Sequence, residues 1–250
     1  MMDSEQRPDR TGRGFADRRA AGAALAGRLA PYAGSPDVIV LALPRGGVPV
    51  GFEVARALGA PLDVFVVRKL GVPGHDELAM GAVASGGLVV LNRGMIQSLG
   101  LHDTDMSRVL DVEQRELERR ERQYRDDRPP PGVTGKIVIL VDDGLATGSS
   151  MLAAVEALKQ DRPARLIAAV PVGAADTCSA LRRYADDVVC AITPTPFYGV
   201  SAWYDDFHQV TDDEVRGLLR RADEEWTHGH DSRHEPASPA SPMAPTLISR

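Results

Sequence analysis

The sequence predicts an α/β fold in which helices flank both faces of a Rossmann-like parallel sheet. Apolar, β-branched runs of strand length alternate along the chain with segments whose apolar residues recur at helical spacing. This alternation is typical of βαβ units, and therefore of a parallel sheet covered by helices. At 250 residues, the chain is long enough for one substantial domain with a closed core.

The individual elements follow one another in a regular order. A first helix is expected over Phe15–Leu29, whose apolar and alanine positions have helical spacing. Gly59 is expected to cap the C-terminus of a helix over Val48–Leu58. The remaining expected elements are parallel strands at 37–43, 62–67, 136–141, 165–172 and 188–192, helices after Ser149 and over 174–184, and a hairpin of 78–84 with 88–91 around Ser85-Gly86-Gly87.

Residues 101–128 combine a narrow apolar stripe with many charges. The stripe contains Met106, Leu110, Leu117 and Tyr124, and oppositely charged residues four positions apart occupy most of the remaining surface. This pattern predicts an amphipathic helix packed on the edge of the sheet. A dimer contact is the alternative interpretation of the stripe.

The two ends differ in composition from the middle. Residues 1–13 and 228–250 are polar and without periodicity, so both are predicted to be disordered, which places the domain at 14–227. Three histidines of the second segment are interpreted as part of a mobile tail rather than as a metal cluster. They are His228, His230 and His234.

Charge, hydropathy and cysteine content predict the partners that this protein lacks and the state of its thiols. A formal net charge of −6 argues against nucleic acid as a main partner, because proteins that bind the phosphate backbone usually carry a basic surface. No apolar run of membrane-spanning length and no signal peptide is visible, so a cytoplasmic protein without a membrane partner is expected. Cys178 and Cys190 are expected to be buried, reduced thiols.

Residues 137–151 carry the most specific signal. The apolar run Ile137–Val141 is typical of a buried central strand, and Asp142 and Asp143 follow at its carboxyl end, where open α/β sheets bind ligands. Small residues with hydroxyl groups then precede a helix, and their backbone N–H groups suit an anion such as a phosphate monoester. Carboxylates suit ribose hydroxyls and Mg²⁺. The loop residues are Ala146, Thr147, Gly148, Ser149 and Ser150.

This stretch resembles the phosphoribosyl-pyrophosphate (PRPP) binding motif of type I phosphoribosyltransferases, and the resemblance covers about residues 14–222. It implies the type I phosphoribosyltransferase fold with a small hood, and Mg²⁺-dependent transfer of 5-phosphoribosyl from PRPP to a nitrogenous acceptor with release of pyrophosphate. It also implies that Asp142 and Asp143 hold the ribose hydroxyls and the metal, and that the loop binds the 5′-phosphate. Gly144 departs from the family, which more often has a branched apolar residue there, and predicts a locally more flexible loop.

Cations follow the first two predicted strands. Arg45-Gly46-Gly47 forms a turn between a strand and a helix, and it resembles the pyrophosphate loop of the family, which often contains a strained peptide bond. Arg68 and Lys69 follow the second strand on the crevice side of the acidic pair, where they suit phosphate oxygens. All three cations are predicted to stabilise the departing pyrophosphate. In related enzymes the next segment, here 70–78, is a mobile loop that closes over PRPP.

Aromatic residues concentrate at about residues 193–210, after the last predicted strand, in a chain that is only 5% aromatic. Such a concentration suggests a platform on which a flat ring can stack. By resemblance to hypoxanthine-type enzymes this segment is a hood over the base, in which Phe197 and Tyr198 match best. Trp203 and Tyr204 are interpreted as a packing cluster.

The acceptor is not specified by these residues. Hypoxanthine-type enzymes have an aspartate where this chain has Ala146 and a lysine in the hood, whereas no lysine follows Lys159 here. Hypoxanthine and guanine are therefore disfavoured, although a nucleobase remains the expected class. One alternative is a non-catalytic regulator of the same fold that binds PRPP or a nucleotide, and another is a receiver domain, which the loop fits poorly. The resemblance and the helix at 101–128 together predict a homodimer.

Overall fold

The computed structural model describes residues 14–73, 75–125 and 128–231, with only the backbone of Asp76, Glu77 and residues 229–231. The predictions of disorder at 1–13 and 232–250, and His234, lie outside these ranges. Helix α7 (Asp212–Asp231) runs past residue 228, the predicted start of the tail. None of the helices in the described ranges is long and apolar enough to cross a membrane.

A five-stranded parallel sheet forms the centre of the molecule and confirms the predicted fold class. Its strands are nearly continuous apolar runs because helices cover both faces. In spatial order the strands are β2 (Leu62–Val64), β1 (Val38–Ala42), β6 (Ile137–Val141), β7 (Arg165–Val172) and β8 (Asp187–Ile192).

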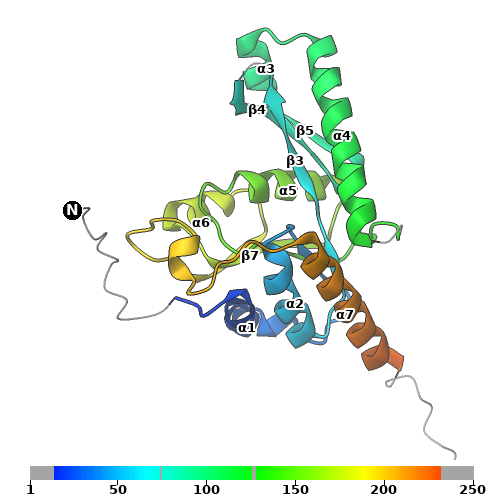
Figure 1. The fold of residues 1–250 in the computed structure, drawn as a ribbon, viewed down its shortest axis with the longest axis vertical. Coiled ribbons are helices and arrows are strands. Elements are labelled where there is room, and N and C mark those ends of the chain that lie inside the picture. The colour runs from blue at the N-terminus through cyan, green and yellow to red at the C-terminus, as the bar shows by residue number, and fades with distance from the viewer. Residues whose placement is uncertain (1–13, 74, 126–127, 232–250) are drawn as a thin grey trace, which may run out of the picture.

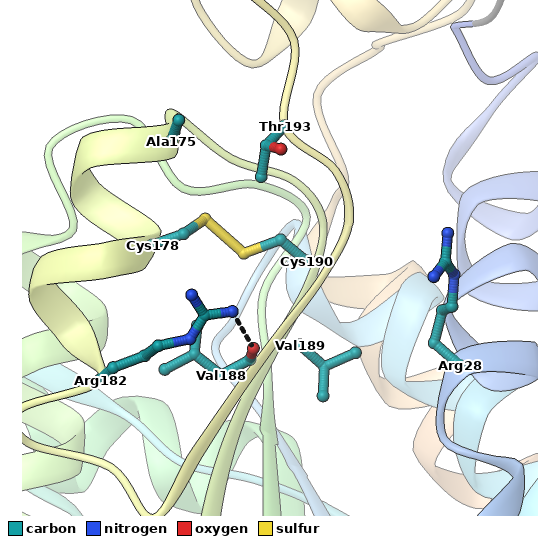
Figure 2. Close-up of a pocket in the computed structure, with 8 residues that line it drawn as sticks. All are labelled: Arg28, Ala175, Cys178, Arg182, Val188, Val189, Cys190 and Thr193. Carbon is teal, nitrogen blue, oxygen red and sulfur yellow. Dashed lines mark hydrogen bonds between the residues drawn. A yellow bond between two sulfur atoms is a disulfide. The ribbon is translucent and has the colours of Figure 1, made fainter.

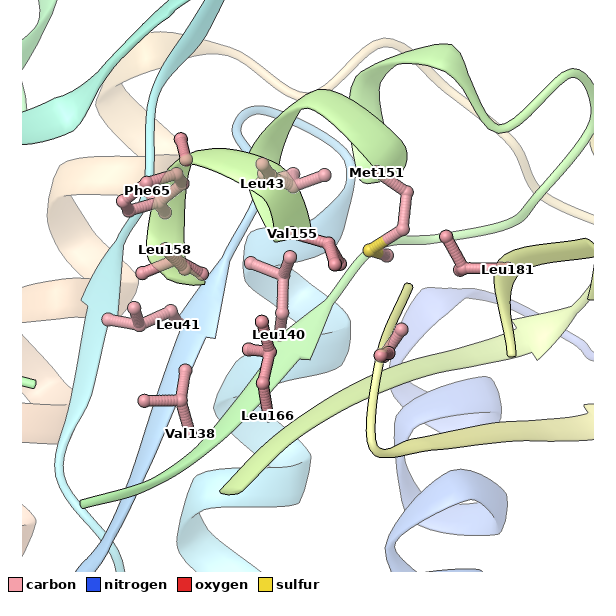
Figure 3. Close-up of a cluster of buried hydrophobic side chains, with 14 of the residues drawn as sticks. Leu41, Leu43, Phe65, Val138, Leu140, Met151, Val155, Leu158, Leu166 and Leu181 are labelled. Carbon is pink, nitrogen blue, oxygen red and sulfur yellow. The ribbon is translucent and has the colours of Figure 1, made fainter. Parts of the chain in front are cut away.

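The helices are divided between the two faces of this sheet (Figure 1). On one face α1 (Arg18–Arg28) and α2 (Gly47–Leu58) share an apolar cluster with the strands. On the other face α5 (Ser149–Gln160) and α6 (Ala175–Leu181) pack on the strands. Figure 3 shows the second core, where Met151, Val155 and Leu158 of α5 lie over side chains of β1, β6 and β7.

The order of the strands reverses between β1 and β6. The connection from β1 through α2 leads outward to β2, whereas β6 leads through α5 to β7 on the opposite side. At such a switch point the loops that leave the two strands diverge and open a crevice at the carboxyl ends. The loops after β1 and β6 are those that carry Arg45-Gly46-Gly47 and Asp142-Asp143, so the topology brings the two predicted motifs together.

A second, antiparallel sheet stands away from the first, at the top of Figure 1. It contains β3 (Val67–Val72), β4 (His75–Ala84) and β5 (Leu88–Leu91), followed by α3 (Arg93–Leu99) and α4 (Asp103–Arg125). The predicted hairpin is confirmed, and so is a parallel strand that begins at Leu62. Its predicted end at residue 67 is wrong, because β2 ends at Val64 and Val67 begins β3 in the second sheet. The loop at 70–78 is also wrong, since β3 and β4 pair there.

Helix α4 confirms the predicted amphipathic helix. Leu117 and Tyr124 are 1% and 2% exposed, and Met106 and Leu110 pack against the same apolar cluster, which includes residues of β3, β4 and α7. The apolar stripe is therefore used inside the chain. The packing interpretation of the stripe is confirmed, and the dimer stays a prediction.

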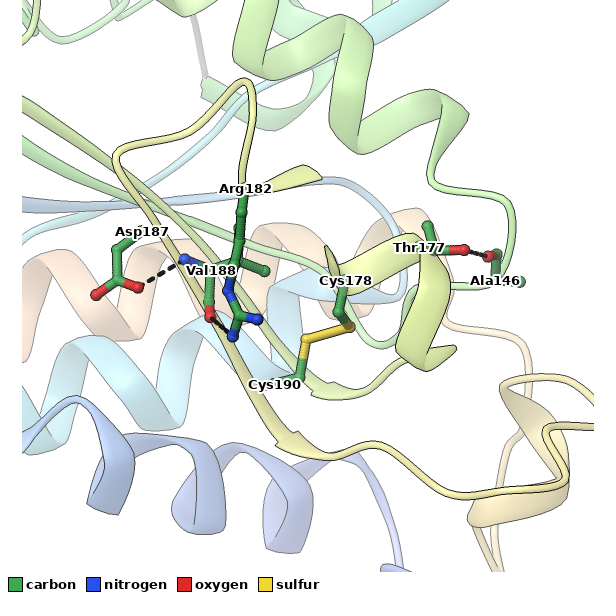
Figure 4. Close-up of a disulfide and its surroundings, with 7 residues drawn as sticks. All are labelled: Ala146, Thr177, Cys178, Arg182, Asp187, Val188 and Cys190. Atoms are coloured by element: carbon green, nitrogen blue, oxygen red, sulfur yellow. Dashed lines mark hydrogen bonds between the residues drawn. A yellow bond between two sulfur atoms is a disulfide. The ribbon is translucent and has the colours of Figure 1, made fainter. Parts of the chain in front are cut away.

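Cys178 and Cys190 are joined by a disulfide between α6 and β8 (Figure 4), and the prediction of reduced thiols is wrong. The two residues are 12 positions apart in sequence. The sequence places one on a helix and one on a strand, but only the packing of α6 beside the end of β8 brings the sulfur atoms together.

Candidate active site

The loops after β1 and β6 lie against each other at the switch point. The Leu43 N–H donates to the Val141 carbonyl oxygen at 2.8 Å. A Cβ on Gly47 would lie 2.7 Å from that oxygen and 3.0 Å from the Asp142 Cα, and one on Gly46 would overlap the Asp143 carboxylate. The peptide bond from Pro44 to Arg45 is cis. Both glycines are therefore needed for the close approach of this turn to the acidic pair.

Substituting Gly47 tests this close approach. Gly47→Ala is expected to lower the free energy of unfolding by about 1–3 kcal/mol, because the added methyl group meets backbone atoms that cannot rotate away. Gly217→Ala is the matched control. Gly217 lies in helix α7, and a Cβ added there meets nothing within 4 Å. Urea denaturation measures both variants, and equal stability of the two would contradict the steric account.

The two carboxylates are unequal in their partners. The Asp143 N–H donates to the Asp142 carboxylate at 2.8 Å, and Arg18 Nε donates to Asp143 Oδ2 at 2.8 Å. Burial raises the pKa of Asp142 well above its usual range, and the neighbouring charge of Asp143 raises it further. Burial also raises the pKa of Asp143, while the Arg18 guanidinium opposes that shift. Acidic pairs with such perturbed pKa values at a crevice are candidates for ligand binding.

The raised pKa of Asp142 predicts a gain of stability when its charge is removed. Because the pKa is higher in the folded than in the unfolded state, ionisation penalises the folded state, and the penalty is complete above the folded pKa. Asp142→Asn is therefore expected to increase the free energy of unfolding at pH 8 by about 0.5–2 kcal/mol. The gain shrinks as the pH falls toward the unfolded value of 3.8, and a gain independent of pH over that range would contradict this cause.

Arg18 is a site residue that the sequence did not reveal. It lies in the first turn of α1, is 8% exposed, and also donates to the His208 carbonyl oxygen at 2.8 Å. Its neighbour Arg19 points elsewhere and pairs with Glu53 at 3.1 Å. Two adjacent arginines at the start of a helix carry no local signal that distinguishes them, because the partners of Arg18 are far away in the sequence.

The loop after the acidic pair leads directly into α5. Gly148 adopts the left-handed conformation at the N-cap, with φ of 74°, and Ala146, Thr147, Ser149 and Ser150 are exposed. The Thr177 hydroxyl of α6 donates to the Ala146 carbonyl oxygen at 2.8 Å (Figure 4). This arrangement leaves backbone N–H groups at the start of a 12-residue helix accessible to an anion.

Gly144 has a steric role in this loop. A Cβ at this position would lie 3.0 Å from the Val200 Cβ and closer still to its methyl groups. The hood thus packs directly on the loop, and the branched residue that is more usual in the family has no room here.

The three predicted cations occupy two places. Arg45 lies in the crevice loop, and its guanidinium is 4.0 Å from the Asp212 carboxylate at the start of α7. Arg68 and Lys69 belong to β3 rather than to a loop at the end of β2, and Arg68 pairs with Glu113 of α4 at 2.6 Å. Lys69 is exposed. Of the three, Arg45 belongs to the loop that contacts the acidic pair, through the neighbouring Gly46 and Gly47.

The hood contains a packed part and an exposed part. Tyr204 is 3% exposed, packs with Phe15 and Phe207, and donates its hydroxyl to the Asp143 carbonyl oxygen at 2.5 Å. Trp203 packs against the same cluster, so the predicted packing role of Trp203 and Tyr204 is confirmed. Of the two residues predicted to bind a base, Phe197 packs partly against this cluster and Tyr198 is 70% exposed.

A separate pocket of about 450 Å³ lies at β8 and α6, with the disulfide in its wall (Figure 2). It contains none of the residues predicted for the site. Its lining consists of Arg28, Ala175, Cys178, Arg182, Val188, Val189, Cys190 and Thr193.

The five-stranded parallel sheet, with the acidic pair and the loop before α5 at its switch point, has the architecture expected of a type I phosphoribosyltransferase domain. The chain belongs to the phosphoribosyl transferase domain family, which matches residues 17–204. The crystal structure of TT1426 from Thermus thermophilus is similar to it, with a TM-score of 0.75 and 43% identity over 83% of this chain and 98% of that chain.

Two curated relatives come from Mycobacterium tuberculosis, strains CDC 1551 and H37Rv, and their names give phosphoribosyl transferase as a provisional description. Each is 46% identical to this chain over 208 residues, which are 83% of this chain and 47% of the relative. The chain thus spans about half the length of the curated relatives it matches.

Proposed function

We propose that the protein transfers 5-phosphoribosyl from PRPP to a nitrogenous acceptor, with a nucleobase as the first class to test, and releases pyrophosphate. The observation that carries this proposal is the contact of the Arg45-Gly46-Gly47 turn with Asp142 and Asp143 at the switch point, beside the N-terminus of α5. Binding sites for a pyrophosphate, a ribose and a 5′-phosphate would then follow one another in the order in which these groups occur in PRPP.

Each part has a separate task in this mechanism. The N–H groups of residues 146–150 bind the 5′-phosphate at the positive end of the α5 dipole. Asp142 and Asp143 accept hydrogen bonds from the ribose hydroxyls and fix the sugar. Displacement at the anomeric carbon passes through a transition state that resembles an oxocarbenium ion, as in glycosyl transfer generally. Arg45 and the Gly46 amide stabilise the negative charge that grows on the pyrophosphate. The Gly47 N–H donates to the Leu43 carbonyl oxygen at 3.0 Å, so Gly47 contributes through the close approach of the turn rather than as a donor.

Arg68 and Lys69 do not lie in the crevice loop with Arg45, so their proposed role is a separate one. They lie on β3, in the antiparallel sheet, and Arg68 is neutralised by Glu113 in the described structure. We infer that they assist the pyrophosphate only when this sheet approaches the crevice. Tyr198 and Phe197 are proposed to contact the flat face of the acceptor, and the exposure of Tyr198 supports this role.

Mg²⁺ fits the donor set that the site offers. In the described residues no group of three or more histidine, cysteine and acidic side chains is placed to hold a metal. Mg²⁺ usually binds one or two carboxylates together with substrate phosphates, so Asp142 and Asp143 suit a metal that arrives with PRPP. When bound, it would neutralise charge on the leaving pyrophosphate.

Pyrophosphate release from Mg·PRPP, measured across a panel of purine and pyrimidine bases, tests the proposal. Release with one base supports the transferase and identifies its acceptor. The second candidate is a regulator that binds PRPP or a nucleotide without turnover, and it is favoured if the protein binds PRPP but releases no pyrophosphate with any base. Failure to bind PRPP contradicts the transferase, and failure to bind nucleotides as well contradicts the regulator.

The remaining parts of the proposal rest on the sequence and the resemblance. We propose a homodimer, a cytoplasmic location, and no nucleic-acid or membrane partner. Sedimentation velocity checks the dimer, and a monomer at high protein concentration would contradict it.

A further inference from the structure

Arg18 connects three segments that are distant in the sequence. Its Nε donates to Asp143 Oδ2 after β6, and its Nη1 donates to the His208 carbonyl oxygen in the hood, both at 2.8 Å. Its guanidinium also lies 3.8 Å from the centre of the Phe207 ring. The side chain is 9% exposed, so these contacts form in a largely dry environment where ion pairs and cation–π contacts are strongest.

The hood is attached to the same end of α1 by its backbone. Phe15 N–H donates to the Trp203 carbonyl oxygen at 2.8 Å, and the N–H groups of Asp205 and Asp206 donate to residues 15 and 16 at 2.9 Å. The Tyr204 hydroxyl of the hood donates a hydrogen bond to the Asp143 carbonyl oxygen. The hood, the start of α1 and the acidic pair therefore form one connected unit. Arg18 contacts the hood and is the residue whose side chain bonds the Asp143 carboxylate, whereas Tyr204 bonds the Asp143 backbone.

We propose that Arg18 is a positioning residue that fixes the Asp143 carboxylate and couples it to the hood, so that ligand binding at the acidic pair is transmitted to the residues that would cover the acceptor. This inference rests on the proposed function and deepens it. Arg18 holds Oδ2 of Asp143 and leaves Oδ1 for the ligand. We assign it a positioning rather than a catalytic role, because its Nε and Nη1 donors are engaged by the protein.

The guanidinium is specifically suited to this task. Its planar fork donates in two directions while its face stacks on an aromatic ring, whereas the ammonium group of a lysine is a point charge without a stacking face. Lysine at position 18 can restore the ion pair with Asp143 but not the simultaneous contacts with His208 and Phe207. The Arg18→Lys variant therefore separates the positioning of the carboxylate from the coupling to the hood.

The test combines three substitutions with a matched control. Arg18→Met removes every contact of the guanidinium, and Arg18→Lys keeps the charge. Phe207→Leu removes the stack on Arg18 together with the ring contact to Tyr204 and leaves the ion pair with Asp143. Arg19→Met is the control, because Arg19 is the next residue on the same helix and pairs with Glu53 instead. Calorimetry with Mg·PRPP gives the affinity without turnover. Arg18→Met is expected to weaken it by about 10–100-fold, as is typical when a partner of a ligand-binding carboxylate is removed.

Coupling to the hood has its own spectroscopic readout. The chain has two tryptophans, Trp203 in the hood and Trp226 in α7, so a Trp226→Phe background isolates Trp203. Mg·PRPP is expected to change the Trp203 emission in this background and with Arg19→Met. The change is expected to disappear in Arg18→Met and Arg18→Lys at saturating PRPP. A retained change in both Arg18 variants, or an unchanged affinity in Arg18→Met, would overturn the proposal.

Hydrogen exchange without ligand separates this inference from the proposed function. Faster exchange of the Asp205 and Asp206 amides in Arg18→Met and Phe207→Leu, but not in Arg19→Met, supports the connection to the hood even if the wild-type protein binds no PRPP. Unchanged exchange in both variants contradicts it. If Arg18→Met does not fold, Arg18→Lys and Phe207→Leu decide the result by the same measurements.

Discussion

Pyrophosphate release is expected to fall by at least about 100-fold when Asp143 is replaced with asparagine, a loss comparable to that of one preorganised charged contact to a transition state. The amide keeps the size of the side chain but cannot carry the charge. It weakens the contact with Arg18 and the hydrogen bonds offered to the ribose hydroxyls or to a metal. Steady-state assays with the acceptor that the base panel identifies measure this effect, and PRPP calorimetry shows how much of it is binding.

A matched control distinguishes the loss of this carboxylate from a general change of charge. Asp213→Asn makes the same chemical change at the start of α7, where the side chain is 83% exposed, and is expected to leave the rate unchanged. Activity of Asp143→Asn within about threefold of the wild-type value would show that this carboxylate does not act on the substrate. The crevice assignment would then be wrong.

The largest loss of stability is expected at Arg125, the last residue of α4. This side chain is almost entirely buried, pairs with Asp63 of β2 at 3.0 Å and with Glu121 at 2.7 Å, and donates to the Val64 carbonyl oxygen at 2.6 Å. Burial raises the pKa of Asp63 although Arg125 opposes that shift, so Asp63 depends on this partner. Arg125→Met is expected to lower the free energy of unfolding by about 3–5 kcal/mol, because it leaves the largely buried carboxylate of Asp63 without the cation that neutralises it.

Two further variants test that cause in urea denaturation. Arg119→Met breaks an ion pair with Glu116 on an exposed part of the same helix and is expected to have no measurable effect. Adding Asp63→Asn to Arg125→Met removes the unpaired charge and is expected to recover part of the loss. If the double variant is no more stable than Arg125→Met, the loss comes from packing rather than from the stranded carboxylate.

The sequence by itself determined the parts of the fold that depend on neighbouring residues. Periodicity and β-branched runs placed the parallel strands within a few residues, and Gly59 caps α2 in the left-handed conformation as predicted. The order of residues in 137–151 was sufficient to predict the family, because the strand end, the acidic pair and the loop before the helix follow one another directly in the sequence. The two glycines after Arg45 likewise indicated a turn between a strand and a helix.

Tertiary structure alone decided which distant groups meet. Arg18 and Asp143 are 125 positions apart, and no local pattern distinguishes Arg18 from Arg19. The disulfide likewise joins residues that no local pattern pairs. Arg68 lies in β3, which belongs to the second sheet, because β2 ends at Val64. Local conformational preferences act over a few residues, whereas ion pairs, ring stacking and strand partners are selected by the packing of helices and sheets. The binding motif could therefore be predicted from the sequence, whereas the tertiary contacts that position it could not.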